Sequence, residues 1–357
     1  MLTRLWKRDR SGSGADEAQS QPAVTLADYP GIEPLLDNRD IAGAMALVAA
    51  TRPDLTATER ARIDLQLRPE AYRRAAARPP HDLTWPPEAH EWAAGLPDIQ
   101  VDDLTVESLV NGVMGSGAVI VRGLLDEAAC ARLRDVVDRA LDAFEHRRGA
   151  PDPQWHTPFS GIDGTPLSPT FRKRGYVSFD GQVSVADAPE AAATVLETFT
   201  NAGIPALIES YLGEPPVLTL EKWTLRRVPP DTNTSWHQDG AFLGADVHTI
   251  NLWIALSDCG EKASGLDLVA KRYDEIVATG TPGAYFDWDV AEQVVDESRG
   301  SDPIVSPVFR PGDAVFFDQF LLHRTGVKPG MTENRYALES WFFTPSSHPS
   351  HYEGLLV

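Results

Sequence analysis

The hydrophobic pattern separates a helical first half of the chain from a strand-rich second half. Between residues 32 and 78, apolar positions recur at helical spacing, and Ile41–Val48 is the clearest run. A longer helix is predicted over residues 126–147, with Asp126 as its capping residue. Another helix is predicted over residues 189–212, because Gly213 and two prolines follow as stop signals.

From residue 217 onward the pattern becomes typical of β-strands. Short runs rich in β-branched or aromatic residues are separated by turn residues, and Gly117–Gly123 forms an earlier run of the same kind. Because no helices alternate with the later runs, they favour an antiparallel sandwich or jelly roll over a parallel sheet. The later runs are Val217–Val228, Val247–Leu256, Leu266–Val269, Ala314–Phe317 and Arg335–Phe343.

These patterns predict three parts. Residues 1–30 are rich in Ser, Gly, Gln, Pro and acidic residues, which is typical of disorder. Residues 31–100 form a helical N-terminal appendage, and residues 101–357 form the main domain. Within that domain, residues 271–306 interrupt the strands, either as a lid or pocket wall or as a plain surface excursion.

Composition excludes several classes of protein. The chain has 357 residues, 42% of them hydrophobic, and a formal net charge of −20. Strong negative charge disfavours nucleic acid and membrane surfaces as partners, whereas a small molecule remains compatible with it. There is no apolar run long enough to span a membrane and no secretory signal pattern. Because only Cys130 and Cys259 are present, we expect a reducing cytoplasm. No pattern indicates an oligomeric state.

Three residues form a candidate metal site. His237 and Asp239 are two positions apart, and His323 follows 84 residues after Asp239. In an extended strand, residues i and i+2 share a face at roughly 6.5–7 Å. Two histidines and one carboxylate on one face are the ligand set of non-haem Fe(II) oxygenases, which keep open positions for a co-substrate and O2. Alternatively, the His-x-Asp triplet arises by chance and His323 is a surface or core histidine.

Several segments occur in an order that resembles the phytanoyl-CoA dioxygenase-like family of Fe(II)- and 2-oxoglutarate-dependent oxygenases. The resemblance spans about Val101 to Pro345. It implies a mainly β, α+β fold with flanking helices, in which a double-stranded β-helix (a jelly-roll, cupin-like barrel) holds the metal at one end. The matching segments are Gly117–Gly123 with the helix after it, Trp236–Gly240, Leu252–Asp258, Ser264–Leu268, Pro311–Phe317 and His323–Thr325.

The resemblance also implies roles for individual residues. His237, Asp239 and His323 match the family's iron ligands. Arg335 matches the arginine that binds the distal carboxylate of 2-oxoglutarate, a role that suits a planar guanidinium with two parallel donors. Thr325 and Trp253 match positions beside the co-substrate, and core packing is the alternative reading for both.

The chain departs from the family pattern at two places. Val269–Tyr273 replaces a common Pro-Gly-Ser-His turn, so substrate contacts from that loop differ. Ala337 stands where many relatives carry a hydroxyl. Some co-substrate contacts must therefore come from elsewhere, and Lys222, Thr224 and Arg226 on the first barrel strand are candidates.

The implied activity uses Fe(II), 2-oxoglutarate and O2. It is hydroxylation, or another oxidation, of a C–H bond in a small-molecule or acyl-type metabolite of secondary metabolism, with succinate and CO2 as co-products. Desaturation and ring formation stay open. Asp239 disfavours a halogenase, which has a small residue there. The alternatives are a metal-dependent hydrolase with the same ligands and a non-catalytic small-molecule-binding protein.

Substrate recognition has one candidate segment. Phe171–Tyr176 combines basic and aromatic residues that could bind an anionic group, with Trp155 and His156 at the same entrance. A solvated loop is the alternative interpretation. The role of residues 31–100 is not indicated by the sequence.

Overall fold

The structure is a computed structural model that describes residues 25–74, 95–172, 181–232 and 234–357. The proline pairs after residue 78 and Lys173–Tyr176 of the basic-aromatic segment lie outside these ranges, as do residues 1–24. Among the helices within these ranges, none is long and apolar enough to cross a membrane.

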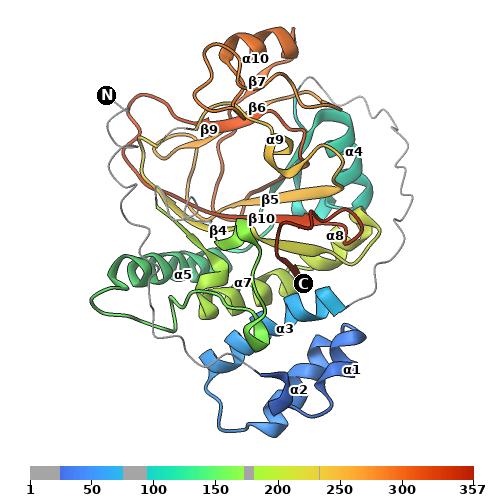
Figure 1. Ribbon diagram of the computed structural model, residues 1–357. Helices are drawn as coiled ribbons and strands as arrows, with labels where there is room; N and C mark the ends of the chain where they lie inside the picture. The colour runs from blue at the N-terminus through green and yellow to red at the C-terminus, as the bar shows by residue number, and fades with distance from the viewer. Residues whose placement is uncertain (1–24, 75–94, 173–180, 233) are drawn as a thin grey trace.

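A large sheet forms the centre of the molecule (Figure 1). Its strands are β1 (Asp98–Gln100), β2 (Ala118–Arg122), β3 (Gln182–Ser184), β4 (Val217–Val228), β5 (Thr249–Ala255), β8 (Ala314–Phe317), β10 (Arg335–Phe343) and β11 (Gly354–Leu356). Their order is β1-β2-β8-β5-β10-β4-β11, and β3 also pairs with β4. The pair β1–β2 is parallel and the other pairs are antiparallel.

A smaller sheet faces part of the large one. It contains β6 (Gly265–Val269), β7 (Ile304–Val305) and β9 (His323–Gly326) in the order β7-β6-β9. Leu266 and Leu268 of β6 share a buried cluster with Trp253 and Phe317 of the large sheet. This cluster packs one face of the large sheet against the smaller one.

Helices cover the other face of the large sheet. They are α4 (Val106–Ser116), α5 (Glu127–His146), α7 (Pro189–Asn201) and α8 (Ile204–Leu212), with the short α6 (Pro169–Arg172) nearby. Successive side chains of a strand point to opposite faces. Along β5, Leu252 and Ile254 therefore pack on the helices while Trp253 points to the smaller sheet.

The five strands predicted after residue 217 are present, with ends displaced by at most two residues. The predicted helix over residues 126–147 is α5, and the Asp126 carboxylate accepts a hydrogen bond from Ala129 N (2.6 Å). The prediction of one helix over residues 189–212 was wrong. Gly203 has a left-handed backbone (φ 69°) between α7 and α8, and Pro205 is the second residue of the second helix.

Three N-terminal helices, α1 (Ile32–Asp37), α2 (Ile41–Thr51) and α3 (Ala57–Arg74), share a buried cluster with Val217 of β4 and Leu356 of β11. Leu26 and Tyr29, which are 7% and 4% exposed, belong to it. Disorder was expected up to residue 30, whereas Leu26 and Tyr29 are packed because these two apolar side chains complete the cluster.

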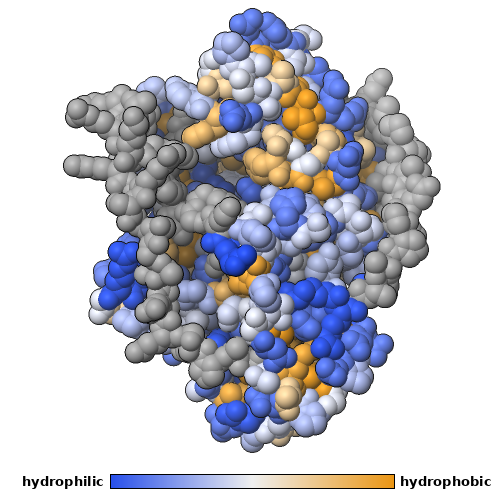
Figure 2. Space-filling view, in the orientation of Figure 1, coloured by the Kyte–Doolittle hydropathy of each residue, from blue (hydrophilic) through white to orange (hydrophobic). Residues whose placement is uncertain are grey.

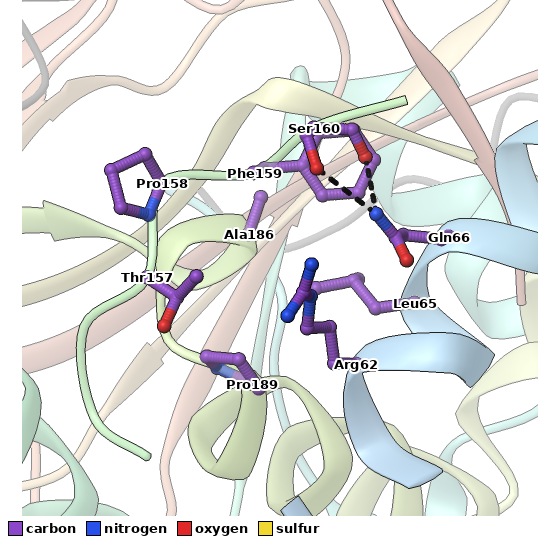
Figure 3. A pocket seen from close by; sticks show the side chains of 9 residues that line it. All are labelled: Arg62, Leu65, Gln66, Thr157, Pro158, Phe159, Ser160, Ala186 and Pro189. Carbon is purple, nitrogen blue, oxygen red and sulfur yellow. Dashed lines mark hydrogen bonds between the residues drawn. The ribbon is translucent and has the colours of Figure 1, made fainter. Parts of the chain in front are cut away.

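The N-terminal helices contact the rest of the chain through α3. Figure 3 shows that Gln66 lies against the segment of residues 157–160, where its amide donates to the carbonyl (2.8 Å) and hydroxyl (3.1 Å) of Ser160. Arg68 donates to the Leu356 carbonyl of β11 (3.0 Å). The cavity at this contact measures about 10 Å³, room for no more than one water molecule.

Candidate metal centre

His237 and His323 are brought together by backbone pairing. Each donates its N–H to the carbonyl of the other (both 3.0 Å), and their ring centroids are 4.4 Å apart. His323 begins β9, as expected of a ligand from a distant strand. Asp239 has helical backbone angles (φ −62°, ψ −24°) and precedes α9 (Gly240–Leu243). The extended strand expected for the triplet is therefore wrong: the chain turns after His237, and the turn aims the carboxylate at both imidazoles.

The three side chains face one point. His237 Nε2 is 4.0 Å from Asp239 Oδ1, and His323 Nε2 is 3.7 Å from Asp239 Oδ2. Two donors that each lie about 2.1 Å from one ion are at most roughly 4.2 Å apart. Both His–Asp separations meet that limit. The bound for all three donor atoms taken together is wider, at 4.8 Å.

Hydrogen bonds orient both imidazoles for metal binding. His237 Nδ1 lies 2.8 Å from the Ser235 carbonyl, and His323 Nδ1 lies 3.0 Å from the Leu321 carbonyl. A carbonyl only accepts, so each Nδ1 carries the proton and donates it. Each Nε2 then keeps a lone pair, the arrangement usual for ligating histidines.

The Asp239 carboxylate is buried within the candidate metal centre. Asp239 is 4% exposed, and its Oδ2 has no hydrogen-bond partner. Burial raises the pKa of Asp239, against the opposing effect of His323 and Lys222. Burial, and then the neighbouring His323, lowers the pKa of His237 well below its usual range. A divalent cation would satisfy the orphaned oxygen and favour these deprotonated forms, so the donor set fits a metal such as Fe(II).

Arg335 lies on β10 with its side chain inside the molecule. It is 1% exposed, its Nη1 donates to the Gly265 carbonyl (3.0 Å), and its Nε has no partner. Burial and the nearby Arg226 lower the pKa of Arg335 to about 10. The guanidinium therefore retains donor capacity for an anionic ligand.

A cavity of about 530 Å³ connects these groups. Its wall includes the three candidate ligands and Arg335, and also the other residues predicted near the co-substrate. The volume lies within the range usual for small-molecule sites, roughly 300–1,000 Å³. The other predicted residues on the wall are Thr325, Trp253, Lys222, Thr224 and Arg226.

Three residues predicted for substrate recognition lie away from the cavity. Trp155 packs beneath Arg139 and His156 packs against Phe144, both on α5. Phe171 is fully buried against Phe159. None of these side chains lines the cavity: Trp155 and His156 pack on α5, and Phe171 belongs to the core between the helices and the large sheet.

The loop that replaces the family's usual turn is structural. Lys271 donates to the Ser298 carbonyl (2.5 Å), and Arg272 forms a buried ion pair with Asp318. The first contact lies within the segment of residues 271–306, and the second ties that segment to the turn before His323. Neither basic side chain lines the cavity.

Sequence reasoning missed two polar groups of the cavity. Glu339 on β10 forms an ion pair with Arg226 and lies 3.5 Å from the Asn251 amide. Glu339 is four residues after Arg335, and Asn251 is two residues before Trp253. Because the side-chain period of a strand is two, this spacing was the signal that could have revealed both.

Sequence reasoning also missed a group of aromatic side chains beside the candidate ligands. Trp288 lies 5.6 Å from the His237 ring and 6.0 Å from Phe242, and Phe286 stacks on Trp288 at 5.1 Å. No periodic pattern marks residues 286–288 in the sequence, so only the three-dimensional arrangement reveals them.

Gln238 connects the ligand turn to two other segments. It is fully buried, and its amide nitrogen donates to the carbonyls of Glu275 (3.1 Å) and Phe320 (2.6 Å). Its amide oxygen accepts from Val277 N (2.7 Å). The side chain between two candidate ligands thus ties their turn to the 271–306 segment and to the turn before His323.

Three solved structures illustrate the similarity of the chain path. One is described as a non-heme alpha ketoglutarate dependent carbocyclase, SnoK, from nogalamycin biosynthesis (TM-score 0.46, 17% identity, 68% of this chain and 85% of that one). Another is AviO1 from Streptomyces viridochromogenes Tue57 (TM-score 0.43, 21% identity, 69% and 98%). A third is the epimerase SnoN in complex with Fe3+, alpha ketoglutarate and nogalamycin RO (TM-score 0.42, 18% identity, 67% and 83%).

No protein of curated function matches the chain. The family model for phytanoyl-CoA dioxygenase (PhyH) matches residues 115–328, which is more than half of the chain and includes all three candidate ligands. The chain therefore belongs to the phytanoyl-CoA dioxygenase (PhyH) family.

Proposed function

We propose that this protein is an Fe(II)- and 2-oxoglutarate-dependent oxygenase that oxidises a C–H bond of a small-molecule or acyl-type metabolite. One observation carries the proposal. His237, Asp239 and His323 converge on one point, where a buried carboxylate oxygen lacks a partner, and they share a cavity with the buried Arg335. We further propose that the two facing sheets form the family's double-stranded β-helix.

Each residue has a defined task in this proposal. The imidazoles of His237 and His323 and the carboxylate of Asp239 would hold Fe(II) and leave its other positions open. Arg335 would bind the distal carboxylate of 2-oxoglutarate, with Thr325 and Trp253 beside it on the cavity wall. Arg226 lies opposite Ala337 and can supply a donor where the usual hydroxyl is missing.

Fe(II) and 2-oxoglutarate, when bound, supply the oxidising chemistry with O2 and leave succinate and CO2 as products. The protein orients the reactants and excludes water. Trp253 and Phe317 are nearly fully buried on the cavity wall, and their apolar surface keeps solvent from the reacting groups. A hydrolase with the same ligands would leave the buried Arg335 without a task.

Succinate formation tests the proposal. Wild-type protein with Fe(II), 2-oxoglutarate and O2 should release succinate slowly even without substrate, and His237→Ala should reduce this release to background. His351→Ala is the matched control, because His351 is exposed at the C-terminal end. Mn(II) binding, followed by electron paramagnetic resonance, should be lost in His237→Ala alone. Succinate release that is equal in both variants would overturn the proposal.

A further inference from the structure

The cavity has two walls of different chemistry. One wall is aromatic and comprises Phe242 of α9 with Phe286 and Trp288 of the 271–306 segment. The other wall is polar and lies on the large sheet. It comprises Lys222, Thr224, Arg226, Asn251 and Glu339.

The rings of the aromatic wall contact one another through Trp288. The planes of Phe286 and Trp288 differ by only 5°, whereas Phe242 meets Trp288 edge to face at 90°. The Trp288 ring also meets the His237 ring edge to face (81°), so the wall reaches the candidate metal centre itself. Figure 2 shows apolar surface around α9 and beneath α10 (Glu292–Arg299) on this side of the molecule.

Hydrogen bonds hold the aromatic turn, Tyr285–Trp288, in place. Phe286 N donates to the Asp289 carboxylate (3.1 Å), and Asp289 N donates back to the Phe286 carbonyl (3.1 Å). The next residue, Val290, donates to the Trp236 carbonyl (2.8 Å), directly before the first candidate ligand. The aromatic wall is thus positioned by the same segment that carries His237.

The two walls meet at Lys222. Its ammonium nitrogen lies 4.0 Å from the centre of the Phe242 ring, and burial lowers the pKa of Lys222 against the attraction of Asp239 and Glu339. A ligand that lies flat on Trp288 therefore has its edge toward cationic and hydrogen-bonding groups. Flat ring compounds with oxygen substituents have apolar faces and polar edges, whereas an alkyl chain has no polar edge.

We propose that the cavity binds a flat, oxygenated ring compound, which stacks on Trp288 and directs an acidic or hydroxyl edge group to Lys222. This inference rests on the proposed oxygenase function and narrows its substrate class, in favour of ring compounds and against long acyl chains. Stacking of this kind adds specific affinity beyond the burial of apolar area.

Binding of two simple probes tests the proposal. With Mn(II) and saturating 2-oxoglutarate under nitrogen, calorimetric titration should show that 3-hydroxy-2-naphthoate binds about tenfold or more tightly than decanoate. Trp288→Leu should weaken naphthoate binding about tenfold or more. Tyr285→Leu is the matched control from the same turn, because Tyr285 is 84% exposed and does not line the cavity. It should leave the affinity within about twofold.

Lys222→Met tests the polar edge. The variant should bind naphthoate severalfold more weakly. Decanoate does not stack on Trp288, so its affinity should stay low. Circular dichroism should confirm that each variant is folded. Three results would each overturn the inference. They are decanoate binding equal to or tighter than naphthoate binding, no naphthoate binding at millimolar concentration, and equal effects of Trp288→Leu and Tyr285→Leu. Succinate release by a protein that prefers decanoate would overturn the ring-compound inference alone, whereas naphthoate binding through Trp288 without succinate release would overturn the proposed function.

Discussion

Arg335 is a buried cation whose surroundings in the protein compensate it incompletely. One guanidinium nitrogen donates to a carbonyl, Nε has no partner, and burial holds the pKa of Arg335 near 10. A buried charge without a counter-ion costs stability, so its retention points to a ligand that pairs with it. Substitution of Arg335 can therefore distinguish a binding role from a structural role.

Arg335→Leu should weaken 2-oxoglutarate binding about 100-fold or more, because a buried charge pair of this kind is worth 2–5 kcal/mol or more, as an order of magnitude. The same change should leave the melting temperature of the ligand-free protein unchanged or raise it, since the desolvated charge is removed. Calorimetry with Mn(II) and thermal melts measure the two effects. Arg310→Leu, at an exposed position, is the control. A lower melting temperature with unchanged affinity would assign Arg335 a structural role.

Glu221 is a second buried charge, on the edge of the cavity. It is 0% exposed, and its carboxylate accepts hydrogen bonds from Glu353 N (3.1 Å) and the Ser168 hydroxyl (3.2 Å). Burial nevertheless raises the pKa of Glu221 to about 7. Between the unfolded pKa near 4.5 and about 7, the folded state holds the proton that the unfolded state releases, so folding stability from this group falls as pH rises through that window.

Glu221→Gln should remove the loss of folding stability that Glu221 causes as the pH rises. Relative to wild type, the free energy of unfolding of the variant should increase between pH 5 and pH 8 by a value on the order of 1–3 kcal/mol. Urea unfolding at both pH values measures the difference, and Glu197→Gln, at an exposed position of α7, serves as the control. A difference that is independent of pH would show that Glu221 is ionised throughout.

At the scale of single elements, the turn that carries two candidate ligands depends on Gln238. Its three hydrogen bonds reach Glu275, Val277 and Phe320, all through backbone groups. Gln238→Met leaves these groups unpaired, and each unsatisfied buried group costs about 1–3 kcal/mol. The 271–306 segment should therefore separate from the ligand turn more often.

Hydrogen exchange detects that separation. In Gln238→Met the Val277 amide should exchange faster, and Mn(II) affinity should fall about tenfold, because groups that orient ligands typically contribute 10–100-fold. Gln293→Met on α10 is the control within the same segment, since its amide bonds only the exposed Glu297. Unchanged exchange at Val277 would show that other contacts hold the segment.

Strand positions could be predicted from the sequence because alternation is local. The range of β4 matched its prediction, and the inward side of β10 follows from the period of two. The break at Gly203 was missed because the apolar positions of α7 and α8 continue one helical pattern across it. The turn after His237 was missed for a different reason: its direction depends on hydrogen bonds from Gln238 to segments that are distant in sequence.

At the scale of the whole molecule, family order singled out His237, Asp239, His323 and Arg335 as candidate site residues, and the structure brings all four to one cavity. The aromatic wall could not be predicted. The ligand positions recur in a known sequence order. By contrast, Trp288 reaches the cavity because the 271–306 segment folds back on Trp236, the residue before His237, where Val290 N donates to the Trp236 carbonyl. Contacts of this kind depend on tertiary packing, which no local spacing encodes.

The N-terminal helices are packed against the large sheet, and this contact bears on the stability of the whole molecule. Their buried cluster contains Val217 of β4 and Leu356 of β11 together with Leu67 of α3. Arg73 of α3 also pairs with Glu353 at 3.3 Å, and Glu353 N binds the Glu221 carboxylate on the cavity edge. Continuous packing from α3 to the cavity predicts that the N-terminal helices and the large sheet unfold together.

Leu67→Ala tests this coupling, because Leu67 is fully buried where α3 meets the sheet. The variant should lose about 2–5 kcal/mol, and thermal unfolding should remain a single transition at a lower temperature when followed both by calorimetry and by tryptophan fluorescence. Ala50→Gly, at an exposed position of α2, should cost only about 1 kcal/mol from helix propensity. If Leu67→Ala instead produced a separate early transition while the tryptophan signal kept its wild-type midpoint, the N-terminal helices would be an independent unit. A single shifted transition would mean that they stabilise the sheet that forms the cavity.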